Sequence, residues 1–136
     1  MSTYPYLNEP ILAQQYFEDK LAFTTGPAEV RDWLRNHSPV AVFDVRDSKD
    51  FQKGHLPGAL NLPQEEWEAT RDLARDRLNV FYCYTANCHL AARAALHFSR
   101  LGYSVLEMDG GIEGWREAGF EIETSPRPEA EFHAPH

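Results

Sequence analysis

Two features of the sequence predict an α/β fold built on a mostly parallel sheet. Short apolar, β-branched runs alternate along the chain with longer segments whose apolar residues recur at helical spacing. Glycine and proline lie mainly between these segments, where they mark turns. Strands that alternate with helices typically form parallel sheets with right-handed crossovers, because each helix returns the chain to the start of the next strand.

Four strands are expected from the apolar runs. Residues 40–45 and 78–82 have the composition of strands that are buried in a sheet, and briefer strands are expected at 59–61 and 104–108. In parallel sheets, ligands bind outside the carboxyl ends of the strands. Three loops of distinctive chemistry follow such ends, at 44–47, from Cys83 onward, and at 108–111.

Six helices are expected around these strands. The first, at residues 9–21, has a broad apolar face that includes Tyr16 and Phe17, and it is expected to pack on the domain as an extra helix. Pro27 suits the first position of the second helix, which ends by Pro39. The others are expected at 47–53, 64–74, 90–101 and 111–118.

Composition limits the classes of function. The chain has 136 residues, 43% of them hydrophobic, which suits one domain with a single core. Its formal charge is −8 and it has no basic stripe, so nucleic acid is not an expected partner. No apolar run approaches the ~20 residues that span a membrane, and the polar N-terminus lacks the pattern of a signal peptide. A cytoplasmic protein without a membrane partner is expected.

Cys83 is the candidate nucleophile. It ends an apolar run and opens the loop Cys-Tyr-Thr-Ala-Asn-Cys-His, which leads into an Ala-rich helix. The N–H groups and the dipole at a helix N-terminus favour thiolate over thiol. A curled loop of successive N–H groups also forms an anion nest, which can hold a terminal sulfur or a sulfonate oxygen. The other interpretation of Cys83 is a small core residue at a strand end.

Five motifs together resemble a known family. They are Asp44-Val45-Arg46, Gly54-His55-Leu56-Pro57-Gly58-Ala59, Cys83 after a strand, Leu101-Gly102-Tyr103, and Asp109-Gly110-Gly111-Ile112 with Trp115. In this order and spacing, residues 24–122 resemble a single-domain rhodanese, a sulfurtransferase family. Residues 1–23 are then an N-terminal helical extension, 24–123 a rhodanese-like domain and 124–136 a mobile tail.

The resemblance implies a three-layer fold in which a five-stranded, mostly parallel sheet is flanked by helices. It also implies a persulfide on Cys83. Thiosulfate or a persulfide donor gives its sulfane sulfur to the thiolate, and cyanide, a thiol or a protein acceptor removes it, with no cofactor or metal. Two half-reactions on one nucleophile predict ping-pong kinetics. The loop residues expected around the sulfur are Tyr84, Thr85, Ala86, Asn87, Cys88 and His89.

Three interpretations of Cys88 are open. It can be a small structural residue at the start of the helix. It can be a resolving cysteine that attacks an oxidised or persulfidated Cys83, which would make the chain a redox-active dithiol protein. It can also join His89 in a metal site, although no second Cys/His pair has suitable spacing.

Two further classes of protein are alternatives. Cysteine-based phosphatases and arsenate reductases of related fold use a Cys-x5-Arg loop, and the arginine position counted from Cys83 is His89. The chain therefore lacks the bidentate ligand that such an enzyme needs for its oxyanion. Non-catalytic binding modules of the fold usually lack the cysteine, so Cys83 argues against that class.

Several residues outside the loop have a structural and a functional interpretation. Asp44 and Arg46 are expected to form an ion pair that ties loops together, and Arg46 is also a candidate for substrate contact. His55 is expected to hydrogen-bond within a turn, and His97 to be a satisfied packing histidine on an apolar helix face. Trp115 is expected in the core.

Overall fold

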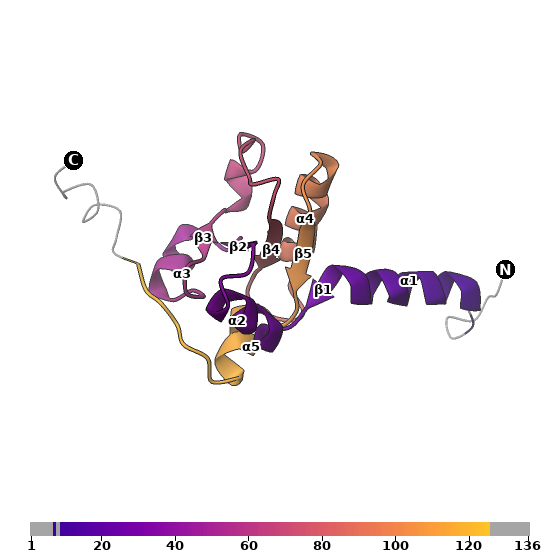
Figure 1. The fold of residues 1–136 in the computed structure, drawn as a ribbon, viewed down its shortest axis with the longest axis horizontal. Coiled ribbons are helices and arrows are strands. Elements are labelled where there is room, and N and C mark those ends of the chain that lie inside the picture. Colours follow the sequence, from indigo (N-terminus) through magenta and orange to yellow (C-terminus); the bar gives the residue numbers. More distant parts are fainter. Residues whose placement is uncertain (1–6, 8, 126–136) are drawn as a thin grey trace.

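A single parallel sheet forms the centre of the protein, whose structure is a computed structural model that describes residues 7 and 9–125 (Figure 1). The strand order is β1-β5-β4-β2-β3, and all four pairings are parallel. The predicted α/β class and the five-stranded sheet flanked by helices are thereby confirmed. The strands are β1 (Thr24–Thr25), β2 (Val40–Asp44), β3 (Leu60–Asn61), β4 (Leu78–Tyr82) and β5 (Val105–Met108).

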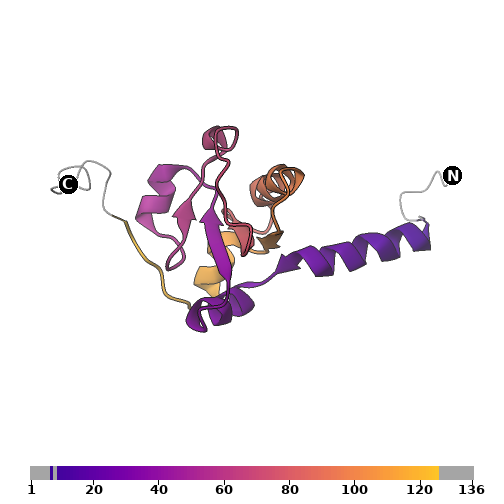
Figure 2. The same ribbon diagram turned by 45° about the horizontal axis from the view of Figure 1, so that its top comes forward.

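Helices lie on both faces of the sheet, as Figure 2 shows. Pro27 begins α2, as its position in the sequence predicts. Asp47 caps α3, because its side chain accepts a hydrogen bond from the Asp50 N–H over 3.0 Å. The helices are α1 (Pro10–Phe23), α2 (Pro27–Arg35), α3 (Ser48–Lys53), the 3₁₀ turn η1 (Gln64–Glu66), α4 (Leu90–Arg100) and α5 (Gly111–Glu117).

Two apolar clusters form the core, one on each face of the sheet. Alternate residues of β4 divide between them: Val80 and Tyr82 belong to the cluster beneath α2 and α5, whereas Phe81 belongs to the cluster beneath α4. Cys83 follows the strand and continues this alternation, so it falls in the α4 cluster. The three layers therefore put the candidate nucleophile on the side of the sheet that α4 covers.

The prediction of a helix at 64–74 is wrong beyond the first turn. Only Gln64–Glu66 is helical, and turns follow it. The segment continues as an irregular chain whose carbonyls bind side chains of other segments: Tyr103 donates its hydroxyl to Arg71 O over 2.6 Å, and the Asn79 amide donates to Ala74 O over 3.2 Å. Tertiary contacts thus take precedence over the local helical pattern of the segment.

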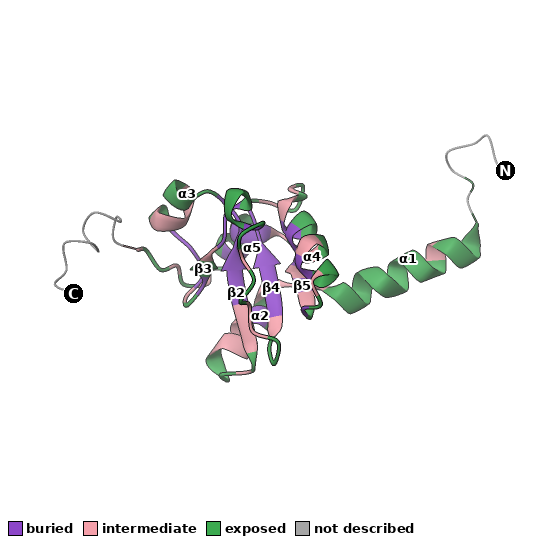
Figure 3. Ribbon diagram, turned by 90° about the horizontal axis from the view of Figure 1, so that it is seen from above, coloured by how far each residue is buried: buried purple, intermediate pink, exposed green. Residues whose placement is uncertain are grey.

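The prediction of the first helix is confirmed, but the prediction that this helix packs on the domain is wrong. None of the α1 residues is buried, and the helix extends away from the sheet (Figure 3). Only its C-terminal end meets the domain, where it leads directly into β1. The apolar residues of α1 therefore lie in contact with solvent in the isolated chain.

The expected C-terminal tail falls largely outside the described residues, which end at 125. Within the described part, the Ser125 N–H donates to Gln52 O over 3.2 Å, so the chain still contacts α3 at that point. Among the helices that the structure describes, none combines the length and the apolar character needed to cross a bilayer.

Candidate functional site

The N-terminus of α5 supports the loop that begins at Cys83 through backbone hydrogen bonds. The N–H groups of Ile112 and Glu113 donate to the carbonyls of Cys83 and Tyr84, over 2.9 and 3.1 Å. Gly111 makes this approach possible. Its φ is +60°, and a Cβ there would lie 2.6 Å from Cys83 O. The Asp-Gly-Gly sequence after β5 thus serves to support the cysteine loop.

A tight turn shapes the rest of the loop. The Cys88 N–H donates to Thr85 O, and the Asn87 N–H donates to Thr85 Oγ1, both over 3.2 Å. This turn brings the chain back to the start of α4, where His89 is the N-cap residue and makes no side-chain cap. The first N–H groups of α4 are therefore directed toward the loop.

The thiol of Cys83 is buried, contrary to the expected exposed thiolate. Cys83 is 2% exposed, and its Sγ lies 3.7 Å from the carbonyl oxygen of Cys88. Burial and the hydrogen bond to the Cys88 side chain raise the pKa of Cys83 to about 12, although the N–H groups of Ala91 and Tyr84 oppose this shift. Two backbone N–H groups thus favour the Cys83 thiolate, as the sequence predicts, but desolvation outweighs them.

Cys88 is the more acidic of the two thiols. Burial by itself would raise the pKa of Cys88. The hydrogen bond from Cys83 and the N–H groups of Leu90 and Tyr84 outweigh burial and lower that pKa below its ordinary value. The pKa shifts of the two neighbouring thiols therefore run in opposite directions, upward for Cys83 and downward for Cys88.

The predicted Asp44–Arg46 ion pair is confirmed, and it is buried. Arg46 donates to both carboxylate oxygens of Asp44, over 2.7 to 3.2 Å, and to Gly54 O over 2.6 Å. Tyr82 donates its hydroxyl to the same carboxylate over 2.7 Å. Asp44 holds the pKa of Arg46 above its ordinary value even though burial lowers it. Arg46 thus joins the end of β2 to the segment after α3, and Asp44 joins the end of β2 to β4 through the Tyr82 hydroxyl.

Tyr84 connects this network to the cysteine loop. The Arg46 guanidinium lies 5.5 Å from the centroid of the Tyr84 ring, and the Tyr84 hydroxyl donates to Asp50 over 2.6 Å. Asp50 and Tyr82 were not predicted as site residues, because no motif marks them. The hydrogen bond from Tyr84 lowers the pKa of Asp50.

The other loop residues form the rim of the site. Ala86, Asn87 and His89 are exposed, and Thr85 is half-buried. His89 lies near Glu107 of β5, whose pKa is held above its ordinary value by burial and by the charge of Asp109. All six loop residues predicted from the sequence therefore lie together beside Cys83.

A sequence model described as the rhodanese-like domain matches residues 26–118. The chain belongs to this family. Thiosulfate sulfurtransferase GlpE of Pseudomonas savastanoi pv. phaseolicola is 36% identical over 98 residues, which are 69% of this chain and 88% of that protein. The crystal structure of the BH2092 protein from Bacillus halodurans superposes with a TM-score of 0.76 at 30% identity, covering 85% of this chain and 87% of the other.

The rhodanese-like domain also occurs within longer relatives. The HTH-type transcriptional regulator Rv0324 of Mycobacterium tuberculosis is 36% identical over 90 residues, which are 65% of this chain. The chain spans only 40% of that regulator's length. Membership of the family therefore identifies the fold and relates the chain to sulfurtransferases, and the activity of this chain has to be argued from its own residues.

The remaining predicted residues have structural positions in the rhodanese-like domain. His55 is buried, its Nδ1 lies 2.7 Å from Phe51 O, and Trp115 is fully buried, so both predictions are confirmed. The prediction of a satisfied His97 is wrong. Its buried Nε2 has no hydrogen-bond partner among the described residues, although the ring packs 4.8 Å from that of Phe98.

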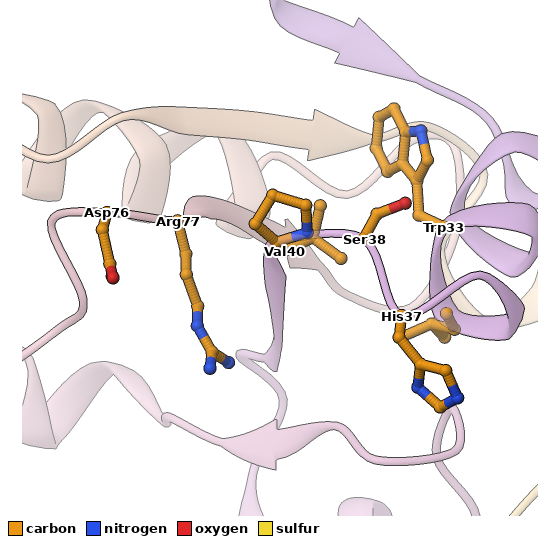
Figure 4. A pocket seen from close by; sticks show the side chains of 8 residues that line it. Trp33, His37, Ser38, Val40, Asp76 and Arg77 are labelled. Atoms are coloured by element: carbon orange, nitrogen blue, oxygen red, sulfur yellow. The ribbon is translucent and has the colours of Figure 1, made fainter.

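A pocket of about 490 Å³ lies at the other end of the sheet from Cys83 (Figure 4). It opens beside Val40, where β2 begins, and Arg77, just before β4. No residue of the cysteine loop lines it. Within residues 9–125, no three His, Cys, Asp or Glu side chains come together as a metal site. The candidate site is therefore defined by the chemistry of the loop and not by the size of a cavity.

Proposed function

We propose that Cys83 transfers sulfane sulfur from thiosulfate or a persulfide donor to a thiophilic acceptor, as a rhodanese-type sulfurtransferase. The observation that carries this proposal is the set of backbone N–H groups, from Tyr84 and Ala91, that act on the Cys83 sulfur at the carboxyl end of β4. Such donors stabilise negative charge as it builds up on a terminal sulfur. The sulfurtransferase named among the relatives supports the same reaction class.

The first half-reaction begins with a proton transfer inside the thiol pair. Cys88, as thiolate, accepts the proton of Cys83 in an uphill step, because the opposite pKa shifts of the two thiols make Cys83 the weaker acid. The Cys83 thiolate then attacks the sulfane sulfur of thiosulfate. A new S–S bond forms at Cys83, the S–S bond of thiosulfate breaks, and sulfite leaves with the electron pair.

The second half-reaction regenerates the enzyme. Cyanide, a thiolate or a protein thiolate attacks the outer sulfur of the persulfide, and the Cys83 thiolate leaves with the electron pair of the broken S–S bond. Cys83 then recovers its proton from Cys88. No metal or cofactor enters this scheme, and we infer that the loop residues 84–89 hold the outer sulfur.

Local donors have to attract an anionic substrate, because the chain carries a net charge of −8. Arg46 is not available for this role in the proposal, since Asp44 and Gly54 occupy its guanidinium. The backbone N–H groups at the start of α4 and the exposed imidazole of His89 are left as the hydrogen-bond donors at the rim. His89 also stands where a phosphatase would need arginine, so phosphoryl transfer has no support from the loop.

A redox-active dithiol is the second candidate function. The contact between the Cys83 thiol and the Cys88 segment, at 3.7 Å, together with the lowered pKa of Cys88, favours a disulfide between the two. This function and sulfur transfer use the same nucleophile, so they differ only in whether the first intermediate is a persulfide or an internal disulfide.

Intact-mass analysis after thiosulfate treatment tests the primary proposal. The wild type and Cys88→Ser should each gain the mass of one sulfur atom, and cyanide should remove it with release of thiocyanate. Cys83→Ser should gain nothing while keeping its fold by circular dichroism. Sulfur loading of Cys83→Ser would overturn the assignment. If that loading is lost when Cys88 is replaced as well, Cys88 would be the carrier.

A further inference from the structure

The N-terminal helix α1 exposes six large apolar side chains. The exposed fractions are 77% for Ile11, 68% for Leu12, 58% each for Tyr16 and Phe17, 79% for Leu21 and 56% for Phe23. Figures 1 and 3 show the helix extending from the sheet with no other element beside it. Contiguous exposed apolar surface of this kind indicates an interaction site.

Nothing within the described chain accounts for the stability of α1. The helix has 14 residues, and none of them is buried. Isolated helices of about this length are marginal in water even with favourable sequences, because nucleation costs more than a few hydrogen bonds return. Pro10 starts the helix, yet Glu9 gives no side-chain cap. A partner that covers the apolar side chains would supply the missing stabilisation.

Most of the apolar residues share one half of the helix. At the helical angle of about 100° per residue, Leu12, Phe23, Tyr16, Phe17 and Leu21 follow one another around one half-turn. Ile11 lies on the opposite half, among Gln15, Glu18 and Asp19. We call the first half the apolar arc of α1. A shallow hollow along part of the arc has Phe17 and Leu21 in its wall.

We propose that a second copy of this chain covers the apolar arc, with the two α1 helices antiparallel about a two-fold axis between Tyr16 and Phe17. In this register, the two Phe17 rings meet near the axis on one edge of the contact, and Leu12 lies near Phe23 of the partner subunit on the other edge. An antiparallel pair places the two rhodanese-like domains at opposite ends, since each domain follows the C-terminus of its own α1.

The charges on the arc favour the antiparallel arrangement. Lys20 lies on the same half of α1 as the apolar arc, near the C-terminal end, and Glu9 lies on this half just before the helix. In the antiparallel register, Glu9 lies four residues, about 6 Å along the helix axis, from the position opposite Lys20 of the partner subunit, within reach of the long lysine side chain, whereas parallel pairing would bring like charges together. The acidic chain and the single lysine of α1 disfavour an anionic membrane as the occupant.

The area of the arc suits a weak dimer. A fully exposed large side chain presents about 200 Å², so the five arc residues, at 56–79% exposure, present roughly 650 Å² per subunit. Stable interfaces bury about 800 Å² per partner. The arc is therefore slightly smaller than a standard interface, and dimerisation is expected at micromolar concentrations.

Sedimentation equilibrium of the full chain tests the proposal, over about 1 to 100 μM. The wild type should be a dimer at the upper end of this range. Phe17→Glu should weaken the dimer by at least about tenfold, because it sets two carboxylates at the two-fold axis. Ile11→Glu is the matched control: it adds the same charge at a more exposed position outside the arc, and it should leave the dissociation constant within about twofold.

A charge exchange tests the orientation. Glu9→Lys alone should weaken the dimer, and Glu9→Lys combined with Lys20→Glu should restore it, which a parallel pair cannot do. A wild type that stays monomeric overturns the proposal, whether or not it binds phosphatidylcholine vesicles. Equal effects of Phe17→Glu and Ile11→Glu, or no rescue by the double exchange, also overturn it. Thermal unfolding of each variant checks that the rhodanese-like domain is intact.

Discussion

The backbone of Gly111 lies against the carbonyl oxygen of Cys83. The contact is so close that a Cβ at position 111 would lie 2.6 Å from this oxygen and 2.7 Å from the next carbonyl oxygen, that of Tyr84. The adjacent Ile112 N–H donates to Cys83 O over 2.9 Å. The end of β4 and the start of α5 are therefore joined through the backbone, and the position of the nucleophile depends on a residue 28 positions later.

Gly111→Ala should destabilise the protein and distort the cysteine loop. The methyl group has to displace backbone atoms, and φ of +60° adds strain, so we expect a loss of more than about 3 kcal/mol in the free energy of unfolding. Gly119→Ala is the control, because φ is +78° there but no atom lies within 4 Å of the new methyl group. It should cost about 1–2 kcal/mol. Similar losses for both variants, by urea denaturation, would contradict the contact.

Asp44→Asn should be strongly destabilising. Asp44 is fully buried, and removing its charge leaves the Arg46 guanidinium uncompensated in the protein interior. We expect a loss of about 3–5 kcal/mol. The control is Glu121→Gln, which breaks the solvent-exposed Arg31–Glu121 pair and should not change stability measurably. Urea denaturation followed by tryptophan fluorescence distinguishes these outcomes, and equal stability of Asp44→Asn and wild type would refute the argument.

The pH dependence of sulfur loading should report the thiol pair. Burial raises the pKa of Cys83 to about 12, while hydrogen bonds lower that of Cys88 despite its own burial. Loading needs a thiolate, so kcat/KM for thiosulfate should rise with pH around the lowered pKa of the pair, below the ordinary thiol value of about 8.5.

Cys88→Ser should move this rise to higher pH, because the internal proton acceptor is lost and Cys83 stays buried. His89→Gln is the control, since it removes a neighbouring titratable group but keeps both thiols, and its profile should keep the wild-type midpoint. An unchanged midpoint in Cys88→Ser would show that the two thiols titrate independently.

Mild peroxide should give a reversible disulfide between Cys83 and Cys88. Peroxide converts one thiol of the pair to sulfenic acid with release of water, and the thiolate of the other then attacks that sulfur as hydroxide leaves. Peptide mass mapping should find the linked pair, and dithiothreitol should restore activity. Cys88→Ser should instead accumulate sulfinic acid at Cys83 and stay inactive. Sulfinic acid at Cys83 beside a free Cys88 in the wild type would exclude a resolving role.

Local pattern was enough to predict most of the sheet and the place of the candidate site. The apolar runs that became β2 and β4 carry their own signal, and Cys83 follows the second of them directly. The Asp44–Arg46 pair was also predictable, because two opposite charges separated by one residue at a strand end can reach each other. The predicted loop residues lie together for the same reason, since they are contiguous in the sequence.

Long-range contacts decided the features that the prediction missed. The two threonines of β1 form a strand only because they pair with Glu107 and Met108 of β5. The segment expected as a helix at 64–74 is irregular beyond its first turn, and the Tyr103 hydroxyl binds its Arg71 carbonyl from 32 residues away. No window of neighbouring residues contains this bond or the pairing of β1 with β5.

The sequence by itself determined which residue is the candidate nucleophile, and only the tertiary structure decided its ionisation. The helix N-terminus next to Cys83 favours a thiolate and is visible in the sequence. Burial under α4 and the hydrogen bond to Cys88 act in the other direction, and they depend on how the loop folds over the sheet. Desolvation is a property of all the atoms around a group, so it could not be obtained from the order of residues along the chain.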